Sequence, residues 1–263
     1  MEKGKMLDPM DLWLKKVRDE PRVQDLIEEI LSGPPSFLLL AGRPGIGKTN
    51  MALQIGFSLA TGTPFLGFRT AKVRVAYLGF EGSKEKLADR IEKMSLNFPR
   101  PIPLFHLDII PPFKFKGDNI IQIEEAARGC QVMIIDPLKY LVPGNYIQPS
   151  DALAFLTDVR NYMKRNTASF IFCHHIRKPN LNSLLEPGDL FESKGATDYA
   201  EAATSVLLLE REKQKHNPTG GFAKVDPDNT ILYFSKTRDA LGALDPLSLH
   251  FDRQRLLWMK RQY

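Results

Sequence analysis

Short apolar runs, each about the length of a buried strand, recur along the chain and are separated by segments with helical spacing. The first runs cover residues 36–41, 73–78, 102–107, 132–136 and 168–173. Between them, apolar residues return every third or fourth position in residues 50–60, 83–94, 117–128 and 150–165. Strands that alternate with helices form parallel sheets with helices on both faces. The pattern therefore predicts an α/β fold with a mostly parallel central sheet flanked by helices.

The pattern changes in the last quarter of the chain. Residues 194–203 have helical spacing, but the runs after them follow one another without a helix between them. These runs lie at residues 205–210, 230–235, 247–251 and 256–259. Successive strands without crossover helices favour antiparallel pairing. We expect an antiparallel C-terminal extension of the sheet.

Residues 1–35 are predicted to form an N-terminal helical arm, and residues 36–263 a single domain. Apolar residues recur at helical spacing in two blocks, which end before Gly33. They are Met10, Trp13, Leu14 and Val17, and then Val23, Leu26, Ile27, Ile30 and Leu31. The arm either packs on its own domain or docks on a neighbouring subunit, and the sequence favours neither.

Composition narrows the class of protein. The chain has 263 residues, 43% of them hydrophobic, which is enough for a substantial core. A formal net charge of +5 permits an anionic partner such as nucleic acid without requiring one. The two cysteines cannot build a disulfide framework or a four-ligand zinc site. Since there is no run of 18 apolar residues and no signal-peptide pattern, we expect a cytoplasmic protein.

Residues 42–49, GRPGIGKT, match the phosphate-binding loop pattern in full. The predicted strand before this loop and the predicted helix after it are the context that the motif needs. Backbone N–H groups at such a helix start bind phosphates, the lysine reaches the β- and γ-phosphates, and the threonine hydroxyl holds Mg²⁺. The predicted nucleotide-binding residues are Gly42, Arg43, Pro44, Gly45, Ile46, Gly47, Lys48, Thr49 and Asn50.

Two carboxylates follow predicted strands at the edge where parallel sheets bind ligands. Asp136 ends the run VMIID, which has the form of a Walker B strand, and is expected to hold the water shell of Mg²⁺ with Thr49. Glu81 lies just past residues 73–78 and is positioned to polarise the water that attacks the γ-phosphate. A solvated glutamate or a cap for the next helix is the alternative for Glu81.

Several cationic or titratable side chains are candidates for phosphate contacts. His174 and His175 end a predicted strand, so at most one of them faces the γ-phosphate, and backbone partners are the alternative. Lys236 and Arg238 share one side of an extended segment and can jointly reach a γ-phosphate, which could be that of the next subunit. A charged edge strand is the alternative.

Two loops carry candidate nucleic-acid contacts. Residues 137–149 combine basic and aromatic groups and include Lys139, although an ordinary crossover loop explains them equally. Residues 176–193 lack periodicity and begin with Arg177 and Lys178. These three cations are the predicted nucleic-acid contacts.

The order of these parts resembles the RecA-like P-loop ATPases, and among them the hexameric replicative helicases of the plasmid RepA and DnaB type (superfamily 4). The segments that carry the resemblance are GRPGIGKT at 42–49, AYLGFEG at 76–82, VMIID at 132–136, FCHH at 172–175, ESKGATDYAEAA at 192–203 and SKTR at 235–238.

The resemblance implies an ATP- and Mg²⁺-dependent hydrolase that acts on single-stranded DNA in replication or related DNA transactions. The nucleotide lies at a subunit boundary of a homo-oligomer, a hexameric ring or a filament. By similarity Glu81 is the catalytic base, Arg90 an adenine contact, and His174 or His175 the γ-phosphate sensor. Lys236 and Arg238 resemble the pair of cations that one subunit of such a ring contributes to the nucleotide of its neighbour. The loops of residues 137–149 and 176–193 correspond to the two loops that face the central channel and the DNA.

The chain departs from the RepA pattern at two points. Ala202, Ala203 and Thr204 stand where RepA-type proteins carry an arginine, so the cationic role falls on Lys236 and Arg238. Neither channel loop is rich in basic residues. The alternative is therefore a nucleotide-gated regulatory or recombination ATPase of the RadA-paralogue or KaiC-like kind, without helicase activity. The GxGxxG fingerprint of dinucleotide enzymes is absent.

Overall fold

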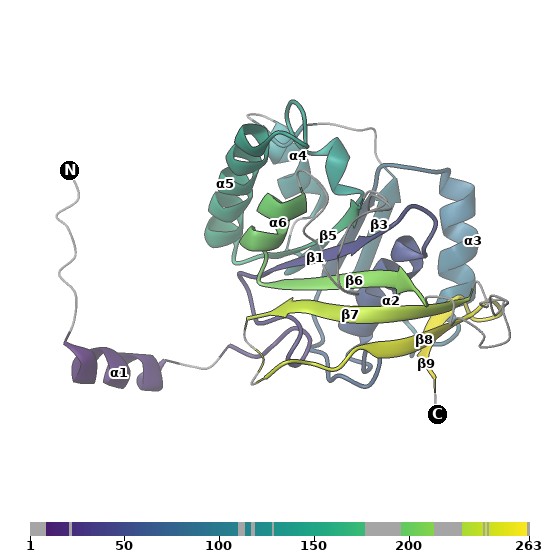
Figure 1. Ribbon diagram of the computed structural model, residues 1–263, viewed down its shortest axis with the longest axis horizontal. Helices are drawn as coiled ribbons and strands as arrows, with labels where there is room; N and C mark the ends of the chain where they lie inside the picture. The colour runs from purple at the N-terminus through teal and green to yellow at the C-terminus, as the bar shows by residue number, and fades with distance from the viewer. Residues whose placement is uncertain are drawn as a thin grey trace, which may run out of the picture.

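A computed structural model describes residues 9–20, 23–109, 114–116, 119–127, 129–176, 196–212, 228–238, 240 and 242–261 (Figure 1). The strands are β1 (Phe37–Gly42), β2 (Val75–Gly79), β3 (Phe105–Ile109), β4 (Val132–Asp136), β5 (Ser169–His175), β6 (Ser205–Arg211), β7 (Asn229–Thr237), β8 (Leu247–Asp252) and β9 (Leu257–Lys260). The helices are α1 (Met10–Asp19), α2 (Lys48–Thr61), α3 (Lys84–Ser95), α4 (Asn119–Ala126), α5 (Pro149–Asn166), α6 (Ala196–Ala202) and a short 3₁₀ helix η1 (Leu138–Tyr140).

The described strands form one sheet in the order β3-β2-β4-β5-β1-β6-β7-β8-β9. The first six strands of the chain pair in parallel, and β7, β8 and β9 continue the sheet in antiparallel pairs. The predicted fold, a mostly parallel sheet with an antiparallel C-terminal extension, is confirmed. Strand β1 lies between β5 and β6, so the loop that follows it opens near the middle of the sheet.

Alternation along the parallel strands divides the interior into two cores, one on each face of the sheet. The first core packs strand residues against α2 and α3, and it includes Leu38, Leu40, Val75, Ile134 and Ile171. The second packs the intervening strand residues against α4, α5 and α6, and it includes Leu39, Ala76, Met133, Phe170 and Leu208. Figure 1 shows α4, α5 and α6 together on one side of the strands. The helices thus cover both faces, as the continuous apolar strands require.

Helix α2 is the most enclosed helix among the described residues. Its buried positions run from Met51 through Ala60 without interruption, because α2 packs on the parallel strands and also on β9 at the edge of the same sheet. The Gln54 amide joins α2 to β9: its Nε2 donates to the Trp258 carbonyl at 3.0 Å, and its Oε1 accepts from the Trp258 N–H at 2.8 Å. The helix that begins in the phosphate-binding loop is therefore fixed to the parallel strands and to β9.

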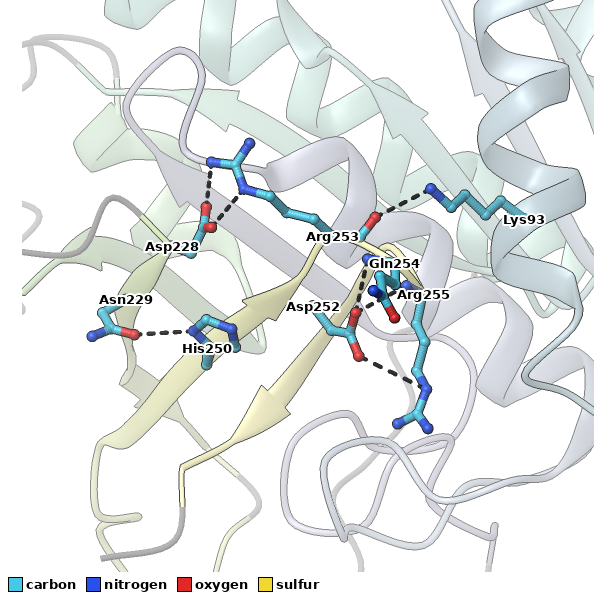
Figure 2. A network of polar contacts seen from close by, with 8 residues as sticks. All are labelled: Lys93, Asp228, Asn229, His250, Asp252, Arg253, Gln254 and Arg255. Carbon is cyan, nitrogen blue, oxygen red and sulfur yellow. Dashed lines mark hydrogen bonds and ion pairs between the residues drawn. The ribbon is translucent and has the colours of Figure 1, made fainter.

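The turn between β8 and β9 is anchored by a polar network (Figure 2). Asp252 accepts hydrogen bonds from the backbone N–H groups of Gln254 and Arg255, which closes the turn. Lys93 of α3 donates to the Arg253 carbonyl at 3.3 Å, and the Arg253 guanidinium pairs with Asp228 at the start of β7. The antiparallel extension is thereby attached to α3 of the parallel half.

The N-terminal prediction is partly wrong. Helix α1 ends at Asp19, and none of its residues is buried. The apolar residues that follow form turns and isolated bridges rather than a helix: Ile27 pairs with Leu31 and with Thr70, and Leu26, Ile30 and Leu31 are buried in the first core. Apolar spacing of three and four residues fits a turn that packs on a domain as well as it fits a helix. The domain boundary at residue 35 stays a prediction, but residues 26–31 pack with the domain.

A smaller difference concerns α5. The spacing predicts a partly buried face containing Leu153, Leu156, Arg160 and Met163; Leu156 and Met163 are buried, whereas Leu153 is 61% exposed. The buried stripe of α5 consists of Ala152, Phe155, Leu156, Val159, Tyr162 and Met163.

Candidate functional site

Strand alternation brings the predicted site residues to one face of the sheet. Asp136 is two residues beyond Ile134, and His175 two residues beyond Cys173, and both of these apolar neighbours lie in the core under α2. Glu81 has the same parity as Tyr77 of β2. Side chains two residues apart share a face, so all of these groups are directed to the side where α2 begins.

The phosphate-binding loop joins β1 to α2 through backbone that only glycine adopts easily. Gly47 caps the helix with φ 101°, and a Cβ at that position would meet the Trp258 ring at 2.6 Å. Lys48 is 4% exposed, and its ammonium donates to the carbonyls of Gly42 at 2.8 Å and Arg43 at 2.9 Å. Burial lowers the pKa of Lys48 to about 8 despite the nearby Asp136 and Glu81 carboxylates.

Asp136 accepts two hydrogen bonds on one carboxylate oxygen. The Thr49 hydroxyl donates to Oδ2 at 2.7 Å, and the Tyr77 hydroxyl donates to the same atom at 2.9 Å. A hydroxyl and a carboxylate at the start of a helix form an all-oxygen donor set, which suits Mg²⁺. In the part of the chain that the structure describes, no group of three or more His, Cys, Asp or Glu residues is placed to hold a metal. Because Mg²⁺ keeps several waters and is held by few protein oxygens, Thr49 and Asp136 fit an ion that also takes ligands from phosphate and water.

Glu81 and Arg90 line a cavity of about 220 Å³ together with Thr49, Tyr77 and Asp136. Arg90 extends from α3, whose first turn is capped by the Ser83 hydroxyl. This position places Arg90 beside the Thr49–Asp136 pair. Its predicted adenine contact remains a prediction.

Glu81 is held by two neighbours from η1. The Lys139 ammonium forms an ion pair with Glu81 Oε1, and the Tyr140 hydroxyl donates to the same oxygen at 2.9 Å. Burial raises the pKa of Glu81, but the hydrogen bonds from Lys139 and Tyr140 outweigh it and lower the pKa overall. Lys139, predicted as a nucleic-acid contact, is therefore engaged within its own domain.

The two histidines have different environments. His174 is 3% exposed and packs between the rings of Tyr146 and Tyr199, and burial lowers its pKa to about 4. His175 is partly buried on the face of Lys48 and Asp136, and its Nδ1 is buried without a hydrogen-bond partner. Of the two, His175 shares the strand face of Lys48 and Asp136, whereas His174 has the parity of Phe172 in the second core.

Lys236 and Arg238 lie far from the phosphate-binding loop of their own chain. The phosphate-binding loop begins at Gly42, which is level with Leu209 of β6 and, one strand further, with Leu232 of β7. Lys236 lies four residues beyond Leu232 on β7 and pairs with Val206, near the amino end of β6. At roughly 3.3 Å per residue, this displaces the two cations by about 13–20 Å along the strand. Both donate to carbonyls at the C-terminal end of α6: Lys236 to Ala200 and Glu201, and Arg238 to Glu201.

Comparison with known proteins assigns the family. The sequence profile of a family described as "AAA domain" matches residues 5–180. The chain belongs to this AAA domain family. No curated protein matches its sequence.

Solved structures resemble this AAA domain protein over nearly its whole length. One of them, an ATPase domain, aligns with a TM-score of 0.62 at 14% identity, covering 96% of each chain. A KaiC-like protein from the hyperthermophilic archaeon Pyrococcus horikoshii aligns with a TM-score of 0.55 at 14% identity, covering 91% of this chain and 94% of that one. The AAA domain protein therefore has the fold of a RecA-like P-loop ATPase. No helix among its described residues has the length and apolar character needed to cross a membrane.

Besides the Lys139–Glu81 ion pair, three more contacts of the AAA domain site were not predicted from sequence. Tyr77 binds Asp136, Tyr140 binds Glu81, and Trp258 packs on Gly47. Strand parity would have indicated Tyr77, because it precedes Glu81 by four residues on a strand. Nothing in the sequence links Trp258 to a glycine 211 positions earlier. The predicted contacts Arg177 and Lys178 lie outside the described residues.

Proposed function

We propose that this AAA domain protein is an ATP-hydrolysing motor of the replicative helicase type, which acts on single-stranded DNA as an oligomer. One observation carries the proposal: Lys48, Thr49, Asp136 and Glu81 converge at the carboxyl edge of the parallel strands. A lysine for the phosphates, an oxygen pair for Mg²⁺ and a carboxylate just beyond the strand are the parts that phosphoryl transfer to water requires.

In the proposed reaction each side chain has one task. The loop backbone and Lys48 bind the β- and γ-phosphates, and Thr49 and Asp136 hold the Mg²⁺ with its water shell. When bound, Mg²⁺ neutralises phosphate charge. Glu81 orients the attacking water and accepts its proton, while His175, on the same strand face as Lys48 and Asp136, is the candidate contact for the γ-phosphate.

The positions of Lys236 and Arg238 support an oligomer. Because these cations lie at the opposite end of the sheet from the loop after β1, they are too distant to reach their own nucleotide. A neighbouring subunit that presents this end would bring two positive charges to the γ-phosphate. Hydrolysis would then depend on assembly.

The first test is steady-state ATP hydrolysis with and without single-stranded DNA. We expect DNA to stimulate the wild type. Lys48→Ala removes the phosphate contact and Arg238→Ala removes a cation given to the neighbour, so each variant alone should lose about 100-fold or more in rate. Arg238→Ala should still bind ATP, as measured with a fluorescent nucleotide.

Mixing the two inactive variants decides whether Arg238 acts in trans. In a mixed oligomer, the Arg238→Ala chain provides a site with an intact Lys48. A Lys48→Ala neighbour provides the intact Arg238 for that site, so activity should reappear in the mixture. Absence of rescue, with mixed oligomers verified by mass, would place Arg238 outside the neighbour's site. Absence of DNA stimulation in the wild type would remove the motor function.

A nucleotide-gated regulatory or recombination ATPase is the second candidate. It is favoured by the similarity to a KaiC-like structure and by the engagement of Lys139 with Glu81 rather than with a partner. Strand displacement on a forked duplex separates the two functions. Displacement that depends on ATP supports the motor, and DNA-independent hydrolysis without displacement supports the regulator.

A further inference from the structure

Glu81 makes an unusual pair of contacts for a carboxylate that must activate water. Lys139 and Tyr140 both bind its Oε1, and the Lys139 ammonium also lies 4.7 Å from the centre of the Tyr140 ring. One oxygen of the carboxylate thus faces a positive charge and a hydroxyl donor at once. This arrangement restrains the orientation of Glu81.

The two restraining residues belong to a well-anchored segment. They lie on η1, in which Leu138 is fully buried, as is Leu141 directly after it. The Leu141 carbonyl accepts a hydrogen bond from the Phe115 N–H at 2.7 Å. The backbone that carries Lys139 and Tyr140 is therefore anchored to the second core. Since only Pro137 separates Asp136 from η1, this part of the 137–149 loop begins beside the proposed Mg²⁺ site.

The contacts oppose the chemistry expected of Glu81. A general base must accept a proton from water, and donors on its oxygen stabilise the ionised form. An oxygen already occupied by an ammonium and a hydroxyl also has less room for a water. Glu81 in this arrangement is a weaker base and a poorer orienter of water than a free carboxylate.

We propose that Lys139 and Tyr140 form a latch on Glu81, which single-stranded DNA opens by drawing the Lys139 ammonium onto its phosphates. The inference rests on the proposed function, because it assigns a regulator to the same hydrolytic site. Lys139 and Tyr140 are positioning residues that act through Glu81.

Exposure and charge make the latch reversible. The side chains of Lys139 and Glu81 are 33% and 43% exposed, so solvent weakens their pairing and a dense row of phosphates can compete for the ammonium. Lys139 lies in the loop of residues 137–149, in which the rings of Tyr140 and Tyr146 are partly buried against the second core and Gly144, Asn145 and Gln148 are exposed. DNA bound along this loop would engage the latch itself.

The test compares ATP hydrolysis by the full chain with Lys139→Met, which keeps the length of the side chain and removes its charge. We expect the rate without DNA to rise about tenfold, a part of the hundredfold or more that a positioned base contributes. The rates at saturating oligothymidine should converge, so stimulation shrinks. Tyr140→Phe should shift the basal rate in the same direction by a smaller factor.

Two controls identify the route of the effect. Lys164→Met removes an exposed charge on α5 and should leave both rates unchanged. Glu81→Gln combined with Lys139→Met should show no gain, because the gain passes through Glu81. The acid limb of the pH–rate profile should move to higher pH in Lys139→Met, a change that a loss of folding would not produce. Lys139, Tyr140, His175 and Lys48 interact electrostatically with Glu81, and Lys86 and Arg90 of α3 line the same cavity.

The outcomes distinguish failure of the latch from failure of the proposed motor function. A basal rate that is unchanged or lower in both Lys139→Met and Tyr140→Phe overturns the latch and leaves the motor intact. A wild type that DNA does not stimulate overturns the motor and the DNA-driven opening. In that case the basal rate of Lys139→Met still reports whether Lys139 restrains Glu81.

Discussion

Lys48 is a nearly buried cation whose charge depends on its surroundings. Its ammonium donates to two loop carbonyls, and burial alone would favour the neutral amine. Asp136 and Glu81 partly offset this effect. With a pKa of about 8, a fraction of Lys48 is neutral under mildly basic conditions. Bound phosphates add negative charge and favour the protonated form.

Nucleotide affinity should therefore fall as the pH rises through 8. Above this pKa a free protein with neutral Lys48 must take up a proton to bind ATP, and between pH 7 and pH 9 the Kd should increase about tenfold. Titration calorimetry in buffers of different ionisation enthalpy measures both the affinity and the proton uptake. Lys48→Arg, which stays charged over this range, should have a flat profile. A flat profile in the wild type would contradict the shifted pKa.

At the residue scale, the sequence predicted the polar groups better than their partners. The motif and strand ends indicated Lys48, Thr49, Asp136 and Glu81, because glycine spacing and strand parity fix where these side chains emerge. The contact of Lys139 with Glu81 depends on how η1 turns back toward β2, and no pattern in residues 137–149 encodes that turn. The sequence consequently predicts only a nucleic-acid contact for Lys139.

At the scale of elements, α2 packs on the parallel strands and on the C-terminal hairpin. Gln54 carries most of the polar connection, since both of its amide atoms bind the backbone of Trp258 in a buried setting. Trp258 in turn packs on Gly47 at the start of the helix. The antiparallel extension therefore contacts both α2 and Gly47 of the phosphate-binding loop.

Gln54→Ala should destabilise the fold by about 2–4 kcal/mol, because it leaves a buried N–H and a buried carbonyl of Trp258 without partners. The melting temperature should fall by roughly 5–10 °C, as followed by circular dichroism. Gln254→Ala, at an exposed turn position, is the matched control and should change stability by less than about 0.5 kcal/mol. Equal melting temperatures for both variants would show that β9 does not hold α2.

Element types were predictable where apolar runs were long and bounded by turn residues. The parallel strands and their crossover helices follow from burial on both faces, which leaves a continuous apolar run. Residues 23–31 had helical spacing but form turns, because Leu26, Ile27 and Leu31 pack against a surface made by distant parts of the chain. The spacing of apolar residues within 23–31 carries no information about that distant surface.

At the scale of the whole molecule, α1 is an amphipathic helix with no buried residue. Trp13 is 54% exposed and Val17 45% exposed, and Figure 1 shows α1 apart from the sheet. An exposed apolar stripe of this kind is typical of a helix that packs on another surface. If α1 docks on a neighbouring subunit, loss of its apolar side chains should weaken the oligomer. If α1 packs on its own domain, the same loss should lower the melting temperature.

The double variant Trp13→Ser/Val17→Ser separates these two arrangements. If α1 docks on a neighbour, the mass measured by light scattering should decrease at a given concentration while the melting temperature of dilute protein stays within about 2 °C. Asp11→Ser/Lys15→Ser, which alters exposed polar positions of the same helix, is the control and should leave the mass unchanged. A lower melting temperature at unchanged mass would instead indicate packing on the same domain.

The distance between the phosphate-binding loop and the Lys236–Arg238 end of the sheet affects how many sites a given assembly completes. With the cations supplied in trans as proposed, an open row of n subunits contains n − 1 complete sites, and a lone subunit contains none. Closing the row into a ring adds the missing site. Turnover per chain would therefore rise with the degree of assembly and decline on dilution, even while every chain remains folded and saturated with nucleotide.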